Sequence, residues 1–365
     1  MTVRDWLILL AIFVAIGSFA TAWLALKLAR GARNGGPADA PAPESAPDSY
    51  AFIVNPSKTS TIQFRSQVLA HFARHGLAAP SFYETTKDDP GRGQAARAIA
   101  EGATVVVAAG GDGTVRSVAG AVAAAGAIMG LVPLGTGNLL ARNIDIDVTS
   151  VPSALSTVTF GATRPIDLGM LRVVEAGDDV PHGADAEPEP FLVIGGIGFD
   201  GAMVADTSST LKERVGWLAY FFAAFRHLHA RRPRMRIRID QGRVFTVRLR
   251  TILIGNCGRL PGGLNLIPDA VIDDGRLDVA ALDARGGLAG WAQLFGEVVM
   301  QGLGIRNSSP KKIGRIDHVT ATRIAVRVLD GTEPVQVDGD TLGAASKIEA
   351  WIEPQALRVR APAAS

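Results

Sequence analysis

The sequence predicts an α/β domain built on a doubly wound parallel sheet, followed by an all-β antiparallel, sandwich-like domain. The first observation is a strand–turn–helix–strand–turn unit from Thr104 to Asn138, in which two apolar runs each end in a glycine-rich turn. Similar units precede it from Tyr50, and strands that alternate with helices indicate a parallel sheet. The second observation is a change after Thr163 to many short alternating runs with few helices, which is typical of an antiparallel sandwich. These runs include Phe191 to Ile197, Arg323 to Val328 and Lys347 to Ile352.

The N-terminal stretch from Trp6 to Leu26 carries no charged side chain. About 20 residues at 1.5 Å each cross a hydrocarbon core of roughly 30 Å, so we predict one N-terminal transmembrane helix. A cleaved signal peptide is the alternative. Lys27, Arg30 and Arg33 follow the span, and the positive-inside rule then places the rest of the chain in the cytoplasm. We therefore expect a single-pass protein of the cell (inner) membrane.

Composition divides the chain into four segments: a transmembrane anchor (1–33), a flexible linker (34–49), an α/β domain (50–155) and a β-rich domain (156–365). The linker is rich in Gly, Pro and Ala and holds too few apolar side chains to fold. The whole chain of 365 residues is 47% hydrophobic and 20% charged, which is ordinary for globular domains. Its single cysteine, Cys257, excludes an intramolecular disulfide.

The two glycine-rich turns of the central unit are Gly110-Gly111-Asp112-Gly113-Thr114 and Gly135-Thr136-Gly137-Asn138. The carboxyl ends of parallel strands meet at one edge of the sheet, so the turns should lie side by side where such sheets bind ligands. Glycines let backbone N–H groups approach phosphate oxygens, and a following helix N-terminus adds positive potential. The pair predicts a nucleotide-phosphate site, although a lone turn of this kind also serves as a plain connection.

The first turn resembles the phosphate-binding loop shared by diacylglycerol kinases, sphingosine and other long-chain-base kinases, NAD kinases and phosphofructokinases. The second turn resembles the lipid-kinase branch. Further matches to the lipid-kinase pattern follow in order: Asn55-Pro56-Ser57-Lys58, Gly196 to Asp200, a block from Gly255 to Asp278, and Val337 to Asp340. The resemblance covers about residues 50–352 and implies an NAD kinase/phosphofructokinase-like first domain.

The resemblance implies an ATP- and Mg²⁺-dependent lipid kinase that transfers the γ-phosphoryl group to a lipid hydroxyl, most simply converting diacylglycerol to phosphatidic acid. Residues 50–155 would bind nucleotide and residues 156–365 the lipid. Rival interpretations are a long-chain-base or phosphatidylglycerol kinase, an NAD kinase-like enzyme, or a non-catalytic nucleotide- or lipid-binding protein. The expected partners are the membrane lipid and an anionic membrane surface, with a homodimer as an option and no nucleic acid.

The resemblance also implies roles for individual residues. Asp340 would be the general base with Asp338 beside it, and Asp112 would act on Mg²⁺ through water. Asp274 would bind a structural metal with the backbone carbonyls of Val271 and Arg276. For each aspartate the alternative is a turn residue that caps its own backbone. The nucleotide-binding residues carried over are Asn55, Pro56, Ser57, Lys58, Thr86, Gly110, Gly111, Asp112, Gly113, Thr114, Gly135, Thr136, Gly137 and Asn138.

The chain departs from the lipid-kinase pattern at two places. Related kinases often follow the first turn with x-Asn-Glu, whereas this chain has Val115-Arg116-Ser117. The near-terminal motif has Asp340 where the family usually has Glu, which sets the carboxylate about one methylene further back.

The helix-period segment Leu211 to His229 runs into alternating arginines, including Arg236 and Arg238. These could form a solvent-facing strand or a basic face for anionic headgroups.

Overall fold

A computed structural model describes residues 48–57, 61–177, 187–198, 232–259, 267, 270–284 and 314–363. The chain separates into two compact units, Met1–Pro47 and Asp48–Ser365, and the description below concerns the second. Several predicted features lie wholly or partly outside the described residues: the apolar stretch Trp6 to Leu26, the helix-period segment Leu211 to His229, Lys58, Phe199-Asp200, and residues 260–266 and 268–269 of the block from Gly255 to Asp278. The division of the chain at residues 33, 49 and 155 stays a prediction.

The predicted single-pass location in the inner membrane, with a transmembrane helix, is corrected. Within the part of the chain that the structure describes, no helix has both the length and the apolar character needed to cross a membrane. The membrane-spanning helix and the location derived from it are therefore not retained.

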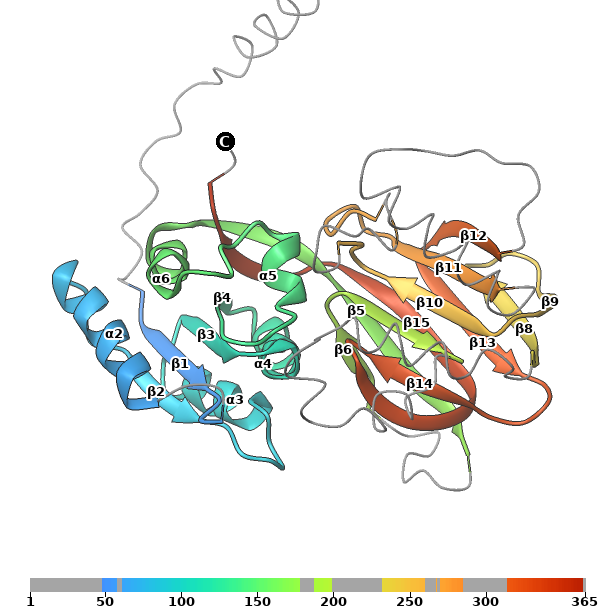
Figure 1. Cartoon of the computed structure of the whole chain (residues 1–365), viewed down its shortest axis with the longest axis horizontal. Coiled ribbons are helices and arrows are strands. Elements are labelled where there is room, and N and C mark those ends of the chain that lie inside the picture. Colours follow the sequence, from blue (N-terminus) through green and yellow to red (C-terminus); the bar gives the residue numbers. More distant parts are fainter. Residues whose placement is uncertain are drawn as a thin grey trace, which may run out of the picture. The chain divides into compact units, whose positions relative to one another are not determined.

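A parallel sheet forms the first part of the unit, as the alternation of strands and helices predicts (Figure 1). Strand β3 pairs in parallel with β1 on one side and β4 on the other, and β1 pairs in parallel with β2. Every residue of β1 and β3 is buried, which explains their unbroken apolar sequences. The elements are β1 (Tyr50–Val54), α2 (Thr61–Arg74), β2 (Ser81–Glu84), α3 (Arg92–Ala100), β3 (Val105–Gly110), α4 (Asp112–Ala125), β4 (Ile128–Pro133), α5 (Leu139–Asn143) and α6 (Val151–Phe160).

Helices cover both faces of this sheet. On one face the ring of Phe52 packs edge-on against Phe64 and Phe72 of α2. The next residue of β1, Ile53, points to the other face, where it and Val118 of α4 surround Gly91. Successive side chains of a strand point to opposite faces, so these contacts show a sheet wound on both sides.

The second part is antiparallel and has two layers with one apolar core between them. The core includes Ile237 of β8, Ile324 of β13, Ile252 of β10 and Val279 of β11. These strands come from residues far apart in the chain, and their apolar side chains are buried against one another. The strands are β5 (Ala162–Ala176), β6 (Glu189–Phe191), β7 (Ile194–Ile197), β8 (Arg234–Ile239), β9 (Phe245–Arg248), β10 (Thr251–Gly255), β11 (Leu277–Ala284), β12 (Gly314–Ala321), β13 (Arg323–Val328), β14 (Glu333–Val337) and β15 (Asp340–Ala361).

The long strand β15 links the two parts of the unit (Figure 1). It starts beside β14 in the antiparallel part and pairs along most of its length with β5. Near its end, Arg358 and Val359 pair in parallel with Ile128 and Met129 of β4. The chain therefore returns to the first sheet, a feature that the short predicted run from Lys347 to Ile352 does not show.

One apolar run is divided in the structure. The sequence predicts a strand from Phe191 to Ile197, but β6 ends at Phe191 and β7 begins at Ile194. The N–H groups of Leu192, Val193 and Ile194 donate to the Asp338 carboxylate. The strand is interrupted because a side chain, and not a neighbouring strand, satisfies these backbone donors.

Candidate active site

The two glycine-rich turns touch at the carboxyl edge of the parallel sheet. Strands β3 and β4 pair in register up to Gly110 and Pro133, and the Leu134 N–H donates to the Gly110 carbonyl at 3.0 Å. A Cβ on Gly135 would lie 2.7 Å from the Gly111 Cα, closer than real Cβ contacts occur. Position 135 therefore needs glycine because the two backbones approach so closely.

Asp112 fastens the first turn to the second. Its Oδ2 accepts the Asn138 N–H at 3.0 Å, and its Oδ1 accepts the Leu139 N–H at 2.6 Å. Burial raises the pKa of the Asp112 carboxyl, while the two backbone N–H groups lower it and the charge of Asp340 raises it further. Both carboxylate oxygens thus hold the start of α5. Asp112 is more than a residue that caps its own turn, because its partners lie in a different turn.

Asn138 shapes the second turn from within. It adopts the left-handed conformation, with φ 48°, which asparagine tolerates better than most residues. Its Oδ1 accepts the Gly135 N–H at 3.0 Å, and its Nδ2 donates to the Gly135 carbonyl at 2.7 Å. The asparagine side chain therefore closes the turn and leaves the glycine backbone at the edge of the sheet.

The first two strands bring further predicted residues to the same edge. The Asn55 N–H donates to the Ala109 carbonyl at 3.1 Å, so the end of β1 lies beside the end of β3. The Asn55 Oδ1 accepts both the N–H and the hydroxyl of Ser57, which makes the predicted turn. At the end of β2, the Thr86 Oγ1 accepts the Asp89 N–H. The four parallel strands therefore present their turns along one edge.

Asp338, which the resemblance sets beside the general base Asp340, has its carboxylate engaged by backbone N–H groups. Its carboxylate accepts three backbone N–H groups, from Leu192 at 2.7 Å and from Val193 and Ile194 at 2.9 Å. Burial raises the pKa of Asp338 to about 6, against the lowering effect of these N–H groups and of Arg116. Its own backbone is left-handed, with φ 48°. In this structure Asp338 fixes the turn between β6 and β7.

Asp340 brings an exposed carboxylate to the glycine turns. It follows Asp338 and Gly339 at the start of β15, and its side chain is 54% exposed. A Cβ on Gly113 would lie 3.5 Å from the Asp340 Oδ2, so the carboxylate lies next to the first turn of α4. The structure thus brings Asp112, Asp340 and both glycine turns together, although Asp340 is more than 200 residues further along the chain.

Arg116, which the sequence marks as a departure from the lipid-kinase pattern without a predicted role, contacts Asp340. Its Nη2 donates to the Asp340 Oδ2 at 2.8 Å, and its Nη1 contacts the Glu189 Oε2 at 3.0 Å. Burial lowers the pKa of Arg116, but the hydrogen bond and charge of Asp340, together with the charges of Asp338 and Glu189, raise it overall. The guanidinium therefore stays charged. The sequence signal for the contact with Asp340 is the departure from the family pattern at Arg116.

The predicted metal site lies on one exposed turn before β11. The structure places Asp274 and Val271 at the surface, and the Asp274 Oδ1 accepts the Arg276 N–H at 2.9 Å. Carboxylate and carbonyl oxygens suit a hard cation, and the three predicted ligands lie on one short segment of the chain. A plain Asp-Gly turn has the same hydrogen bond, so the metal stays a prediction. Within the described residues, no group of three His, Cys, Asp or Glu side chains forms a metal site.

Two buried polar residues, which were not predicted as functional, link segments of the chain behind the site by hydrogen bonds. Asp167 is fully buried and accepts the N–H groups of Gly275 and Gln355 at 2.6 and 2.7 Å. Asn256 is also fully buried, and its Nδ2 donates to the carbonyls of Asp167 and Leu192. Because Leu192 contacts Asp338, these residues connect the turn before β11 to the segment that carries Asp340.

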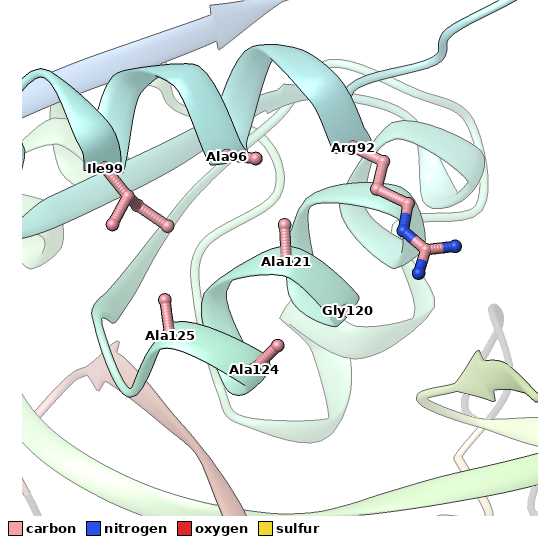
Figure 2. Close-up of a pocket in the computed structure, with 7 residues that line it drawn as sticks. All are labelled: Arg92, Ala96, Ile99, Gly120, Ala121, Ala124 and Ala125. Atoms are coloured by element: carbon pink, nitrogen blue, oxygen red, sulfur yellow. The ribbon is translucent and has the colours of Figure 1, made fainter.

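A groove of about 350 Å³ lies between α3 and α4. Figure 2 shows Ala96 and Ile99 of α3 facing small side chains of α4, with Arg92 at one end. Its α4 residues begin at Gly120, away from the N-terminus of α4 where the first glycine turn lies. None of the predicted site residues lines this groove.

Comparisons with known proteins agree with this arrangement. Residues 49–171 match the family described as diacylglycerol kinase catalytic domain, and residues 194–361 match the YegS C-terminal NAD kinase beta sandwich-like domain. The chain is 34% identical over 270 residues to the "Probable lipid kinase YegS-like" of Pseudomonas fluorescens, covering 73% of this chain and 80% of that protein.

A protein of the same name from Pseudomonas aeruginosa is 30% identical over 286 residues, covering 77% of this chain and 84% of that one. The crystal structure of a diacylglycerol kinase from Bacillus anthracis shares the fold, with a TM-score of 0.60 and 16% identity over 88% of this chain and 99% of that one. These matches span both parts of the described unit. The chain belongs to the family of YegS-like lipid kinases.

Proposed function

We propose that this kinase transfers the γ-phosphoryl group of ATP to the hydroxyl of a membrane lipid, with diacylglycerol as the acceptor and phosphatidic acid as the product. The observation that carries the proposal is the position of Asp340. An exposed carboxylate lies beside two touching glycine turns, next to the N-terminus of the 14-residue helix α4. Phosphates and a proton acceptor would therefore meet at one edge of the sheet.

The glycine turns supply what the phosphates of ATP need. Backbone N–H groups at a helix N-terminus bind phosphate oxygens and add positive potential. Gly111 and Gly135 carry no side chain, so the phosphates would approach the backbone directly. Positioning and electrostatic stabilisation provide most of the rate of phosphoryl transfer. We therefore assign ATP binding to these two turns and to the neighbouring turn at Asn55.

The Asp112 carboxylate at the first glycine turn fits a magnesium ion. Mg²⁺ is usually held by one or two carboxylates together with substrate phosphates. Burial, with a smaller contribution from the charge of Asp340, raises the pKa of Asp112, so a cation beside this carboxylate would stabilise its charged form. Asp112 is the residue that would hold it. When bound, the ion would neutralise charge on the phosphoryl oxygens.

Asp340 is the proton acceptor in this proposal. As the lipid hydroxyl oxygen forms its bond to the γ-phosphorus, the bond to ADP breaks and the hydroxyl proton passes to the Asp340 carboxylate. Asp338 does not compete for this role, because its oxygens accept backbone N–H groups from three residues. Its part is to hold the segment from which Asp340 extends.

The test is an assay with γ-labelled ATP and separate vesicles containing diacylglycerol, a long-chain base or phosphatidylglycerol, with NAD as a soluble acceptor. Asp340→Asn should lower kcat by about 10²–10⁴-fold with little change in KM for ATP, the usual contribution of a general base. Asp147→Asn is the matched control, because Asp147 is an exposed aspartate whose hydrogen bonds stay within its own turn. Label in NAD alone, or in no acceptor, would contradict the proposal.

We also propose that an anionic lipid surface is the partner of strand β8. Its arginines at 234, 236 and 238 alternate with buried Met235 and Ile237, so they share the outer face of the sheet. Arg234 is paired with Asp330, which leaves Arg236 and Arg238 as the residues to change. Changing both to glutamate should weaken co-sedimentation of the protein with phosphatidylglycerol vesicles. Its binding to phosphatidylcholine vesicles should not change. Equal binding by the variant would contradict the assignment. The homodimer stays a prediction.

A further inference from the structure

A single guanidinium joins three distant segments at the candidate active site. Arg116 lies in α4, and its Nη2 and Nη1 contact Asp340 at the start of β15 and Glu189 of β6. Its side chain is only 11% exposed, whereas that of Asp340 is 54% exposed. Buried charges are retained where they are paired, and here one cation is paired with two carboxylates.

Both partners of this contact are positions at which the chain departs from the lipid-kinase pattern. Arg116 stands where related kinases often have Asn, and Asp340 stands where they usually have Glu. The structure places these two departures 2.8 Å apart. A shorter carboxylate and an arginine that holds it are therefore found together in this chain.

Asp340 has few other restraints. It follows two residues with positive φ, Asp338 at 48° and Gly339 at 91°, and opens the strand β15. Among the described residues, Arg116 is the one whose side chain hydrogen-bonds to the Asp340 carboxylate. Without that contact the carboxylate would be free to change rotamer at the surface.

We propose that Arg116 is a positioning residue, which holds Asp340 over the N-terminus of α4 and thereby replaces the reach of the longer glutamate. The inference rests on the proposed function. Arg116 binds Oδ2, the oxygen that also lies nearest Gly113, so Oδ1 is left to take the proton from the lipid hydroxyl. Glu189 holds the other end of the guanidinium and keeps it directed at Asp340.

Kinetics of four proteins test this inference: wild type, Arg116→Ala, Asp340→Asn and the double variant. Arg116→Ala should lower kcat by about 10²-fold, the size expected when a catalytic group is misplaced by about 1 Å, with KM for ATP within about twofold. The double variant should be no slower than Asp340→Asn alone, because Arg116 acts through Asp340. Arg116→Lys should restore little activity, since one ammonium cannot reproduce the two-sided fork of arginine.

Two further variants separate positioning from a general effect of charge. Glu189→Gln removes the far anchor but keeps the Arg116–Asp340 contact, so its loss should be smaller than that of Arg116→Ala. Arg97→Ala removes an exposed arginine paired with Glu101 on α3 and should leave kcat unchanged. A loss for Arg116→Ala that persists in full in the Asp340→Asn background would overturn the inference. So would a higher KM for ATP with unchanged kcat, which would assign Arg116 to the nucleotide.

The same proteins decide the case in which the proposed function itself fails. If wild type labels no acceptor, thermal unfolding of the four proteins still measures the coupling between Arg116 and Asp340. The two single changes should then shift Tm by amounts that do not add in the double variant. Additive shifts would show that the two side chains do not interact. They would refute the Arg116–Asp340 contact whatever the substrate is.

Discussion

Removing the Asp112 carboxylate should both destabilise the fold and abolish phosphoryl transfer. The carboxylate accepts two backbone N–H groups, from Asn138 at 3.0 Å and Leu139 at 2.6 Å. Hydrogen bonds to a charged group contribute about 1.5–3 kcal/mol each. Burial raises the pKa of Asp112, so relief of the buried charge offsets part of this loss. For Asp112→Ala we expect the free energy of unfolding to fall by about 2–4 kcal/mol.

Urea denaturation of Asp112→Ala measures the loss, with an unchanged m-value as the sign that the folded state is otherwise the same. Asp147→Ala is the matched control: its carboxylate accepts the N–H and hydroxyl of Thr149, but on an exposed turn. The control should lose less than about 1 kcal/mol and keep its activity. If both variants lost the same small amount and Asp112→Ala kept normal turnover, the assigned link between the turns and its role at the phosphates would both be refuted.

Three more predictions concern the same unit. Gly135→Ala places a Cβ 2.7 Å from the Gly111 Cα and should cost about 1–3 kcal/mol in urea, whereas Gly111→Ala makes an ordinary 3.6 Å contact and should cost less; equal costs would contradict the close approach. The folded-state pKa of Asp338, about 6, exceeds its ordinary 3.8, so the stability it contributes is complete below pH 3.8 and is lost as pH rises through 6. The free energy of unfolding should therefore fall by up to about 3 kcal/mol more in wild type than in Asp338→Asn between pH 4 and 7.5, and parallel curves would argue against it. If the turn at Asp274 binds a hard cation, Ca²⁺ should raise the Tm of wild type and not of Asp274→Ala, while a rise in both would place the ion elsewhere.

The family matches support the assignment as a lipid kinase. Within the site, the two carboxylates that differ most in their surroundings are Asp338 and Asp340. Asp338 and Asp340 lie two positions apart and look equivalent in the sequence. In the structure one carboxylate accepts three backbone N–H groups and the other is exposed beside the glycine turns. A comparison of Asp338→Asn with Asp340→Asn should therefore separate loss of stability from loss of kcat.

Local patterns in the sequence predict the parallel sheet and the two glycine turns. These features depend on local signals, because an unbroken apolar run such as Val105 to Gly110 is typical of a strand buried on both faces, and glycine indicates where it turns. The short strand β13 is also predicted with the bounds that the structure shows, Arg323–Val328. In each case the residues that decide the structure are neighbours in the chain.

Which residues meet at the site depends on contacts between segments that are far apart in the chain. The interruption between β6 and β7 depends on Asp338, more than 140 residues away, and no local pattern around Leu192 indicates it. The return of β15 to the parallel sheet and the contact between Arg116 and Asp340 are likewise pairings across the chain. Such contacts are set by how the layers pack and not by periodicity. The sequence therefore does not distinguish a turn carboxylate that accepts backbone N–H groups, such as Asp112, from one that is exposed, such as Asp340.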